Sequence, residues 1–229
     1  QITFDPAPAM SIGVTGPFAK GVPVDARNLL WKAAALAGVT GHITVVKNLP
    51  HGAGIGGGSS DAGALLRALG SRDSGLTLGA DVPVCRIARA ARMSGIGEQV
   101  VPLETVPELH AVLVNPGVHL PTPQVFKKLT QKTNAPMPSV LPTWGAARDL
   151  RTWLSTQRND LQAPAMAQAH EIAEVINVLS KEDGQELVRM SGSGATCFAL
   201  FNDAQRAGNA AARILAEHPA WWVKACVLS

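Results

Sequence analysis

The sequence predicts an α+β protein with two domains, residues 1–102 and residues 103–229. Its length of 229 residues suffices for one large domain or two small ones. The first part carries glycine-rich loops that lead into helices, whereas strands and helices alternate in the second part. Apolar residues make up 46% of the chain and charged residues 16%, a composition that excludes a disordered protein.

The N-terminal part predicts strands around one buried helix. Residues 2–14 mix strand-forming residues with Pro6 and Pro8, so they predict an edge strand or an irregular entry. Residues 28–36 are apolar on all sides and predict a short buried helix. Residues 42–46 are rich in β-branched side chains and predict a strand that ends before the glycine-rich stretch.

A second helix is predicted directly after that stretch. Its apolar residues recur at the spacing of one helical face: Ala62, Leu65, Leu66 and Leu69. Ser59 and Ser60 are candidate N-caps, and Asp61 would lie in the first turn, where the helix dipole favours an acid. Further along, residues 84–87 predict a strand, and residues 94–98 predict a turn between strands.

The second part predicts strands and helices in the order β-α-β-β-α-β, with extra helices early. The expected strands are residues 109–114, 187–190, 195–201 and 221–228. The expected helices are residues 123–129, 146–157, 166–180 and 203–217. This order is typical of a ferredoxin-like α+β domain.

Composition and charge exclude several classes of partner. The net charge is +3 and no run of Lys or Arg exceeds two residues, so no polyanion-binding tail is indicated. Aromatic residues make up 4% and Tyr is absent, which disfavours a nucleic acid partner. Three scattered cysteines favour a reducing, cytoplasmic compartment, and no apolar run predicts a membrane span. A monomer and a homodimer both remain open.

A glycine-rich loop occupies residues 51–61, with the sequence His-Gly-Ala-Gly-Ile-Gly-Gly-Gly-Ser-Ser-Asp. Consecutive glycines let backbone N–H groups converge, because no Cβ blocks the positive φ angles that this requires. The helix that follows adds free N–H groups and the positive end of its dipole. The loop therefore predicts a site for a chain of phosphates, to which the two serines could add hydroxyl groups.

Two familiar phosphate-binding motifs do not fit this loop. Residues 52–57 match Gly-x-Gly-x-x-Gly, but a dinucleotide-binding fold needs an acid at the end of a second strand about 20 residues later. Here a helix leads to residues 70–75, and no strand precedes Asp73. The Gly-Lys-Ser/Thr of a P-loop is absent. A dinucleotide-binding oxidoreductase is therefore nearly excluded.

The stretch from Leu49 to Ala62 closely resembles the second motif of the GHMP small-molecule kinases, in outline Pro-x-x-x-Gly-Leu-Gly-Ser-Ser. Five further segments are similar to that family and occur in its order: 76–83 (Leu-Thr-Leu-Gly-Ala-Asp-Val-Pro), 95–98 (Gly-Ile-Gly-Glu), 115–123 (Asn-Pro-Gly-Val-His-Leu-Pro-Thr-Pro), 158–161 (Arg-Asn-Asp-Leu) and 190–195 (Met-Ser-Gly-Ser-Gly-Ala). The resemblance implies a ribosomal protein S5 domain 2-like N-terminal half and a ferredoxin-like C-terminal half.

The resemblance also implies the site residues. The residues that wrap the ATP phosphates would be Gly54, Ile55, Gly56, Gly57, Gly58, Ser59 and Ser60. Asn28 and Lys47 would lie near the adenine, and Asp81 would be the catalytic aspartate, in contact with the substrate. Other substrate contacts would come from Thr122, Phe126, Gly192, Ser193 and Gly194. Mg²⁺ would bridge phosphate oxygens, with Ser60 as its protein ligand.

Within the family, the triple glycine before Ser-Ser-Asp resembles the branch that phosphorylates a cytidine diphosphate-linked methylerythritol in the non-mevalonate pathway to isoprenoid precursors. In that branch Phe126 could stack on the cytosine. Two alternatives remain open. One is a GHMP kinase for mevalonate, homoserine or a sugar, and the other is a nucleotide-binding relative without catalysis.

One motif of the family has no counterpart in this sequence. It reads Pro-x-Lys-x-Asn-Leu and is followed by Asp-Gly-Tyr-His, and its lysine assists the aspartate that corresponds to Asp81. Because the other motifs are intact, we expect the complete protein to carry it. The alternative is a relative that has lost the motif, which would have negligible turnover.

Overall fold

The computed structural model describes all 229 residues, which form two compact units. The first unit comprises residues 1–52 and 56–103, and the second comprises residues 53–55 and 104–229. Each unit has its own apolar core. No helix combines the length and the apolar character needed to cross a membrane.

The sheet of the first unit has three strands: β1 (Ile2–Pro6), β2 (Ser11–Thr15) and β3 (Gly41–Val46). The central strand β3 pairs antiparallel with β1 and parallel with β2. The N-terminal residues therefore form two strands, one on each side of β3, where the sequence predicted a single edge strand or an irregular entry. Both are edge strands, a position that tolerates Pro6.

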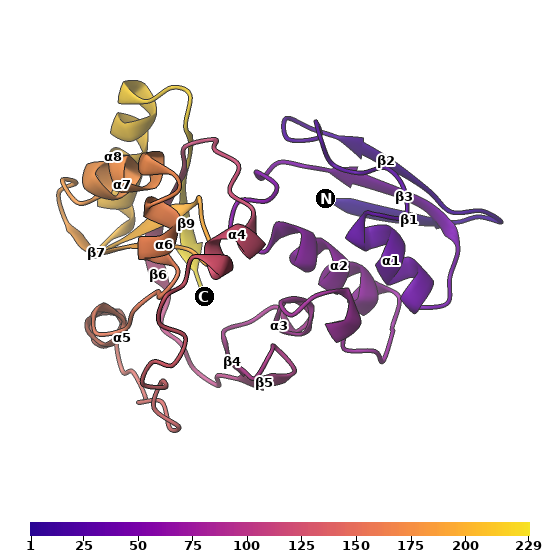
Figure 1. The fold of residues 1–229 in the computed structure, drawn as a ribbon, viewed down its shortest axis with the longest axis horizontal. Coiled ribbons are helices and arrows are strands. Elements are labelled where there is room, and N and C mark those ends of the chain that lie inside the picture. Colours follow the sequence, from indigo (N-terminus) through magenta and orange to yellow (C-terminus); the bar gives the residue numbers. More distant parts are fainter. The chain divides into compact units, whose positions relative to one another are not determined.

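Two helices pack on this sheet, α1 (Leu29–Leu36) and α2 (Gly57–Ala68) (Figure 1). The predicted helix at residues 28–36 is confirmed, and Asn28 is its N-cap, because the Asn28 side chain accepts a hydrogen bond from the N–H of Leu30. The core of the unit includes strand and helix residues that are less than 3% exposed: Leu30, Ala33, Ile43, Val45, Leu65 and Leu66. This core fixes the start of α2 relative to β3.

The start of α2 differs from the prediction. Its N-cap is Gly56, with φ +65°, and the helix begins at Gly57. Ser59 and Ser60 therefore lie inside the first helical turn, and the prediction that they cap the helix was wrong. Asp61 is the fifth residue of the helix rather than part of its first turn. A serine would reach the left-handed conformation of the cap only with strain.

The remainder of the first unit contains the short helices η1 (Leu76–Leu78) and α3 (Val82–Ile87). The prediction of a strand over residues 84–87 was wrong, because Pro83 occupies the first turn of a helix, a position that suits proline. The predicted turn at residues 94–98 is confirmed. It joins β4 (Ala91–Ser94) to β5 (Gln99–Pro102).

The second unit is built on a four-stranded antiparallel sheet with the order β7-β8-β6-β9. Its strands are β6 (Leu109–Asn115), β7 (Gln185–Met190), β8 (Cys197–Phe201) and β9 (Trp222–Leu228). Taken with the helices between the strands, this order confirms the predicted ferredoxin-like half.

The helices of the second unit are α4 (Thr122–Lys127), α5 (Ala147–Ser155), α6 (Gln162–Met166), α7 (His170–Leu179) and α8 (Ala204–Glu217). The helix predicted at residues 166–180 is present as α7 but begins only at His170, because Ala169 has an extended backbone, and Met166 is the last residue of the separate helix α6. Figure 1 shows α7 and α8 beside the sheet, and their fully buried Ile172 and Ile214 belong to the same core as Phe201 of β8.

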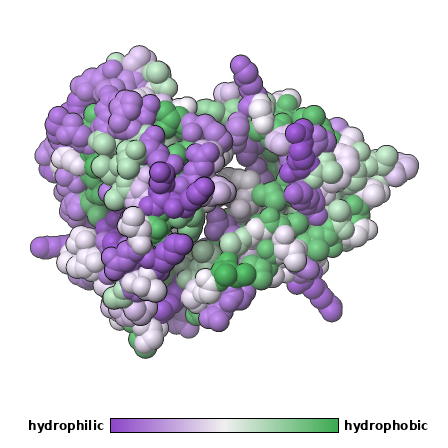
Figure 2. Space-filling model, in the orientation of Figure 1, coloured by the Kyte–Doolittle hydropathy of each residue, from purple (hydrophilic) through white to green (hydrophobic).

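The surfaces of the two units differ in character. Figure 2 shows hydrophilic residues over much of the second unit and more hydrophobic residues on the first. In the first unit the β4–β5 hairpin exposes Met93, Ile96 and Val101, with relative exposures of 43%, 76% and 60%. The apolar side chains at these positions face solvent rather than a core.

Candidate active site

The glycine-rich loop has a backbone that glycine adopts readily and other residues do not. Gly52, Gly54 and Gly56 have φ angles of +64°, +73° and +65°. In this left-handed region the Cβ of an L-residue crowds its own backbone. Every second residue of the loop is therefore a position that requires glycine, while Ala53 between them is buried and Ile55 is half-buried.

The loop ends at the N-terminus of α2. The first hydrogen bond in α2 runs from the N–H of Ser60 to the carbonyl oxygen of Gly56, at 2.8 Å. The N–H groups of Gly57, Gly58 and Ser59 come before this bond and have no acceptor within the helix. The positive end of the helix dipole lies at the same place. These predicted cofactor-binding residues therefore form a backbone suited to bind phosphates.

The tip of the loop belongs to the second unit, where it contacts another glycine-rich turn. The N–H of Thr196 donates to the carbonyl of Ala53 at 3.1 Å, and the Ser191 hydroxyl donates to the carbonyl of Gly54 at 2.8 Å. A Cβ on Gly54 would lie 2.5 Å from the carbonyl oxygen of Gly194 and 2.6 Å from that of Ser191. Direct backbone contact therefore requires glycine at position 54.

A cavity of about 200 Å³ lies in the first unit beside the loop. Both residues expected near the adenine, Asn28 and Lys47, line it, together with Val22, Leu30 and Gly58. Pockets for whole drug-sized ligands occupy about 300–1,000 Å³. This cavity therefore has room for only part of a nucleotide, such as its base.

Asn28 lines the cavity from the N-terminus of α1. It is 9% exposed, and its Nδ2 donates to the carbonyl of Pro23 at 2.6 Å while its Oδ1 accepts from the N–H of Leu30 at 2.9 Å. A carboxamide offers two N–H donors and two lone pairs. The side chain is thus held in place and still has a donor and an acceptor position to offer a ligand.

Lys47 follows β3 and forms an ion pair with Asp61 of α2, with 2.6 Å between Nζ and Oδ2. The Lys47 side chain is 8% exposed and that of Asp61 is 26% exposed. A Cβ on Gly57 would lie 3.9 Å from the Lys47 Nζ. A buried ammonium needs a counter-charge. The pair therefore holds a positive charge beside the first turn of α2.

We expect Asp61→Asn to lower the free energy of unfolding by about 1.5–3 kcal/mol, because the buried Lys47 ammonium loses its counter-charge while the shape is kept. Urea denaturation measures this. Asp25→Asn is the matched control, since the Arg27 and Asp25 side chains of that ion pair are 80% and 49% exposed. The control should have little effect. Equal stabilities for the two variants would contradict the prediction.

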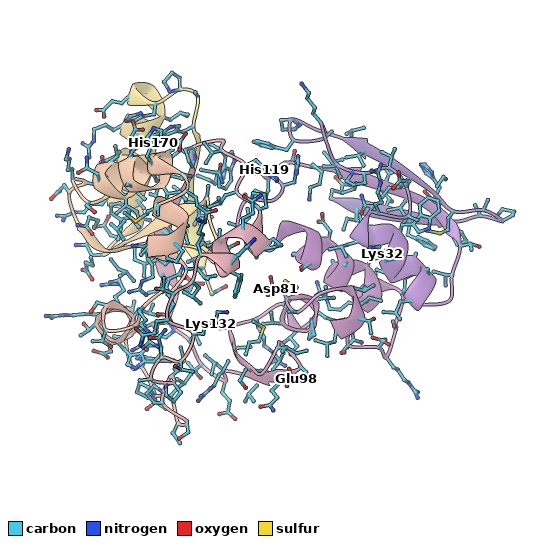
Figure 3. All side chains as sticks on the ribbon, viewed as in Figure 1. Lys32, Asp81, Glu98, His119, Lys132 and His170 are labelled. Carbon is cyan, nitrogen blue, oxygen red and sulfur yellow. The ribbon has the colours of Figure 1, made fainter.

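Asp81 stands at the N-terminus of α3 (Figure 3), and its carboxylate is exposed without a hydrogen bond or ion pair. A Cβ on Gly97 would collide with the carbonyl oxygen of Ala80, so the β4–β5 turn packs closely against the backbone of Ala80, the residue before Asp81. Burial raises the pKa of the nearby Cys85 thiol above its ordinary value, and the negative charge of Asp81 acts in the same direction. The Asp81 carboxylate thus lies at the start of α3 without a side-chain partner, close to a thiol whose neutral form is favoured by burial.

The Ser-Gly-Ser-Gly turn of the second unit is held by a neighbouring segment. The side-chain Nδ2 of Asn159 donates to the carbonyl of Met190 at 2.9 Å and to that of Gly192 at 2.8 Å. Gly192 and Gly194 have φ angles of +53° and +86°. The turn therefore combines backbone conformations typical of glycine with a fixed position relative to the 158–161 segment.

The segment at residues 115–123 also meets this turn. Asn115 Nδ2 donates to the Thr196 hydroxyl at 2.9 Å, and the Oγ atoms of Thr122 and Ser193 lie 2.7 Å apart. The structure thus brings together two of the predicted substrate residues, Thr122 and Ser193. Phe126 lies on the same short helix as Thr122, and the residue is 52% exposed, which leaves it accessible for stacking.

We expect Asn159→Ala to lower the free energy of unfolding by about 1–3 kcal/mol, because two backbone carbonyls lose their donor. Asn177→Ala, at an exposed position on α7, is the matched control and should have little effect. Thermal unfolding of both variants tests this. The same melting temperature for Asn159→Ala as for the unmodified protein would show that the Asn159 bonds do not hold the turn.

Ser60, the predicted metal ligand, is exposed and lines a different cavity of about 420 Å³, which it shares with Ile2, Phe4 and Asp61. Nowhere in the structure do three His, Cys, Asp or Glu side chains gather so that they could hold a metal ion. A role for Ser60 in binding Mg²⁺ remains a prediction.

Three residues of the candidate site went unnoticed in the sequence. Asp61 was expected only as an acid near the start of a helix, and its ion pair with Lys47 spans 14 residues. Asn115 and Asn159 lie in segments matched to the kinases, but no contact was predicted for either. Their presence inside recurring motifs was the one available signal, because their partners lie 81 and 31–33 residues away.

The chain belongs to the GHMP kinases. The family profile described as GHMP kinases N terminal domain matches residues 25–99, and that described as GHMP kinases C terminal matches residues 142–220. The N-terminal match includes the glycine-rich loop and Asp81, and the C-terminal match includes Asn159 and the turn at residues 190–195, while residues 115–123 lie outside both matches.

Individual relatives show which kinase within the family the chain is similar to. The chain is 50% identical over 235 residues to the protein of Dinoroseobacter shibae named 4-diphosphocytidyl-2-C-methyl-D-erythritol kinase, an alignment that covers 100% of this chain and 82% of that protein. It is also 50% identical to the protein of the same name from Paracoccus denitrificans, in an alignment that covers 100% of this chain and 83% of that protein. The structure also superposes on the crystal structure of a 4-(cytidine 5'-diphospho)-2C-methyl-D-erythritol kinase with a TM-score of 0.73. The two sequences are 30% identical, and the match covers 100% of this chain and 85% of that one.

Proposed function

We propose that this protein is an ATP-dependent kinase that phosphorylates the 2-hydroxyl of 4-diphosphocytidyl-2-C-methyl-D-erythritol, a step toward isoprenoid precursors in the non-mevalonate pathway. Two relatives that are 50% identical over the whole chain carry the name of that kinase. The structural observation that carries the proposal is the glycine-rich loop, which runs into the N-terminus of α2 beside the Lys47–Asp61 pair.

The loop and the cavity beside it would bind ATP. The free N–H groups of Gly57, Gly58 and Ser59 would bind the phosphates, while Asn28 and Lys47 would face the adenine end. Gly54, Ile55 and Gly56 would complete the wrap around the phosphates. Positioning the γ-phosphate is the main task of such a site, because phosphoryl transfer requires little covalent chemistry from the protein.

Asp81 would act as the general base. Its free carboxylate would orient the acceptor hydroxyl and take its proton as the hydroxyl oxygen attacks the γ-phosphorus, and the bond to the β-phosphate oxygen would break to release ADP. Thr122 and Ser193 would contact the substrate, with Gly192 and Gly194 shaping the turn, and the exposed Phe126 would stack on the cytosine.

Mg²⁺, when bound with ATP, would neutralise the charge that develops on the phosphate oxygens. The residues present fit a metal carried mostly by phosphate and water, since Mg²⁺ typically keeps several waters. The Ser60 hydroxyl in the first turn of α2 is the protein group we propose beside it.

The test is ADP release by the full-length protein with ATP and one of three acceptors: the cytidyl substrate, mevalonate or homoserine. We expect ADP release only with the cytidyl substrate. Turnover of mevalonate or homoserine instead would assign the protein to another branch of the GHMP kinases. ATP binding without turnover of any acceptor would indicate a non-catalytic relative.

A further inference from the structure

The helices α2 and α3 are in direct backbone contact. A Cβ on Gly63 of α2 would lie 2.8 Å from the N atom of Arg86 and 2.9 Å from the carbonyl carbon of Cys85. One turn later on α2, the Arg67 Nη1 donates to the carbonyl oxygens of Cys85 and Arg86, at 2.7 Å and 2.8 Å. The C-terminal half of α3 is therefore held against one face of α2 by a glycine and an arginine.

The two hydrogen bonds from Arg67 satisfy carbonyl groups at the C-terminal end of α3. The last carbonyls of a helix have no donor within it, and α3 has only six residues. A helix this short is marginal by itself, so its direction depends on the contacts at its ends. Asp81 stands at the opposite end of α3, where its own carbonyl accepts from the N–H of Cys85 at 3.1 Å.

The N-terminal end of α3 has a second support. The N–H of Val82 donates to the carbonyl of Gly79 at 3.0 Å, and Gly97 of the β4–β5 turn packs against Ala80. This support acts on the loop that carries Asp81. Toward its C-terminal end, α3 is held against α2 by the contacts at Gly63 and Arg67, and the Arg86 side chain also donates to the carbonyl of Ser71.

We propose that Arg67 is a positioning residue for phosphoryl transfer, which acts by fixing α3 so that Asp81 meets the acceptor hydroxyl in the productive direction. The inference rests on the proposed role of Asp81. One rigid helix, α2, carries the phosphate-binding residues at its start and Arg67 near its end. Arg67 thus ties the base to the same element that holds the phosphates, although the arginine itself contacts neither ligand.

Steady-state kinetics of Arg67→Met in the full chain tests this role. We expect kcat to fall by about 10-fold to 10²-fold, the scale for a misplaced catalytic group, while KM for ATP changes less than about twofold. Arg67→Lys should recover part of kcat, because an ammonium can still donate to one carbonyl. The control is Arg72→Met, an exposed arginine whose loss removes the same charge. If Arg67→Met does not fold, Arg67→Lys alone must still show the lower kcat.

A double-mutant comparison separates this role from a merely structural one. If Arg67 acts through Asp81, Arg67→Met should lower kcat no further in the Asp81→Asn background, and equal fold-changes in both backgrounds would overturn the inference. Unchanged kcat in Arg67→Met, with kcat lost in Asp81→Asn, would overturn the inference alone. Unchanged kcat in Asp81→Asn would overturn both the inference and the proposed base.

Discussion

Asp81→Asn is expected to lower kcat by at least about 10²-fold, the usual scale for a positioned general base, and to leave KM for ATP unchanged. Asparagine has nearly the same size but cannot take a proton from the acceptor. The carboxylate of Asp81 makes no hydrogen bond, so the change removes no contact that stabilises the fold. Steady-state kinetics with both substrates, together with an ATP titration, measures the two parts of this prediction.

The control for this variant is Asp5→Asn, which removes the same charge from an exposed position on β1. It should leave kcat unchanged. If Asp81→Asn had the kcat of the unmodified protein, Asp81 would lose its catalytic role. If its ATP affinity fell along with kcat, Asp81 would belong to the nucleotide site instead.

Gly54→Ala is expected to weaken ATP binding by about fivefold to 150-fold, because strain of about 1–3 kcal/mol at one residue corresponds to that scale. The φ angle of Gly54 is +73°, and its new Cβ would lie 2.5 Å and 2.6 Å from two backbone carbonyl oxygens. Neither oxygen is the end of a flexible side chain, so the tip of the loop must move away from the turn at Ser191 and Gly194. Isothermal titration with ATP measures the loss.

Gly70→Ala is the control that separates the clash of the new Cβ with backbone oxygens from the strain of a positive φ angle. Gly70 has φ +64°, nearly the same as Gly54, but nothing lies within 4 Å of its added Cβ. This control should lower stability slightly and leave ATP affinity unchanged. Equal ATP affinities for Gly54→Ala and the unmodified protein would mean that contact between the two glycine-rich turns is not needed for nucleotide binding.

The sequence predicted the elements whose signals are local. Residues 28–36 carry apolar residues on all sides of a helix, and residues 29–36 form α1. The alternation of strands and helices in the second half predicted its ferredoxin-like sheet. The glycine-rich loop could also be predicted from the sequence, because three of its glycines adopt positive φ angles that other residues adopt only with strain. These features depend on neighbours within a few positions along the chain.

Other features depend on distant partners and could not be predicted in the same way. Residues 84–87 have the β-branched content of a strand, yet contacts with Gly63 and Arg67 of α2 stabilise them as part of a helix. The N-cap is Gly56 rather than Ser59 or Ser60, so α2 starts three residues earlier than a Ser59 cap would give and four earlier than a Ser60 cap. The pairing of Lys47 with Asp61 requires β3 and α2 to be packed first.

The most direct test of the proposed reaction follows a labelled γ-phosphate from ATP to product. The full-length protein is incubated with γ-labelled ATP, Mg²⁺ and the cytidyl substrate, and the products are separated and examined by phosphorus NMR. We predict that the label appears as one phosphate monoester at the 2-position of the methylerythritol, in equal amount to the ADP formed. Label found only in inorganic phosphate, or at another hydroxyl, would contradict the proposed reaction.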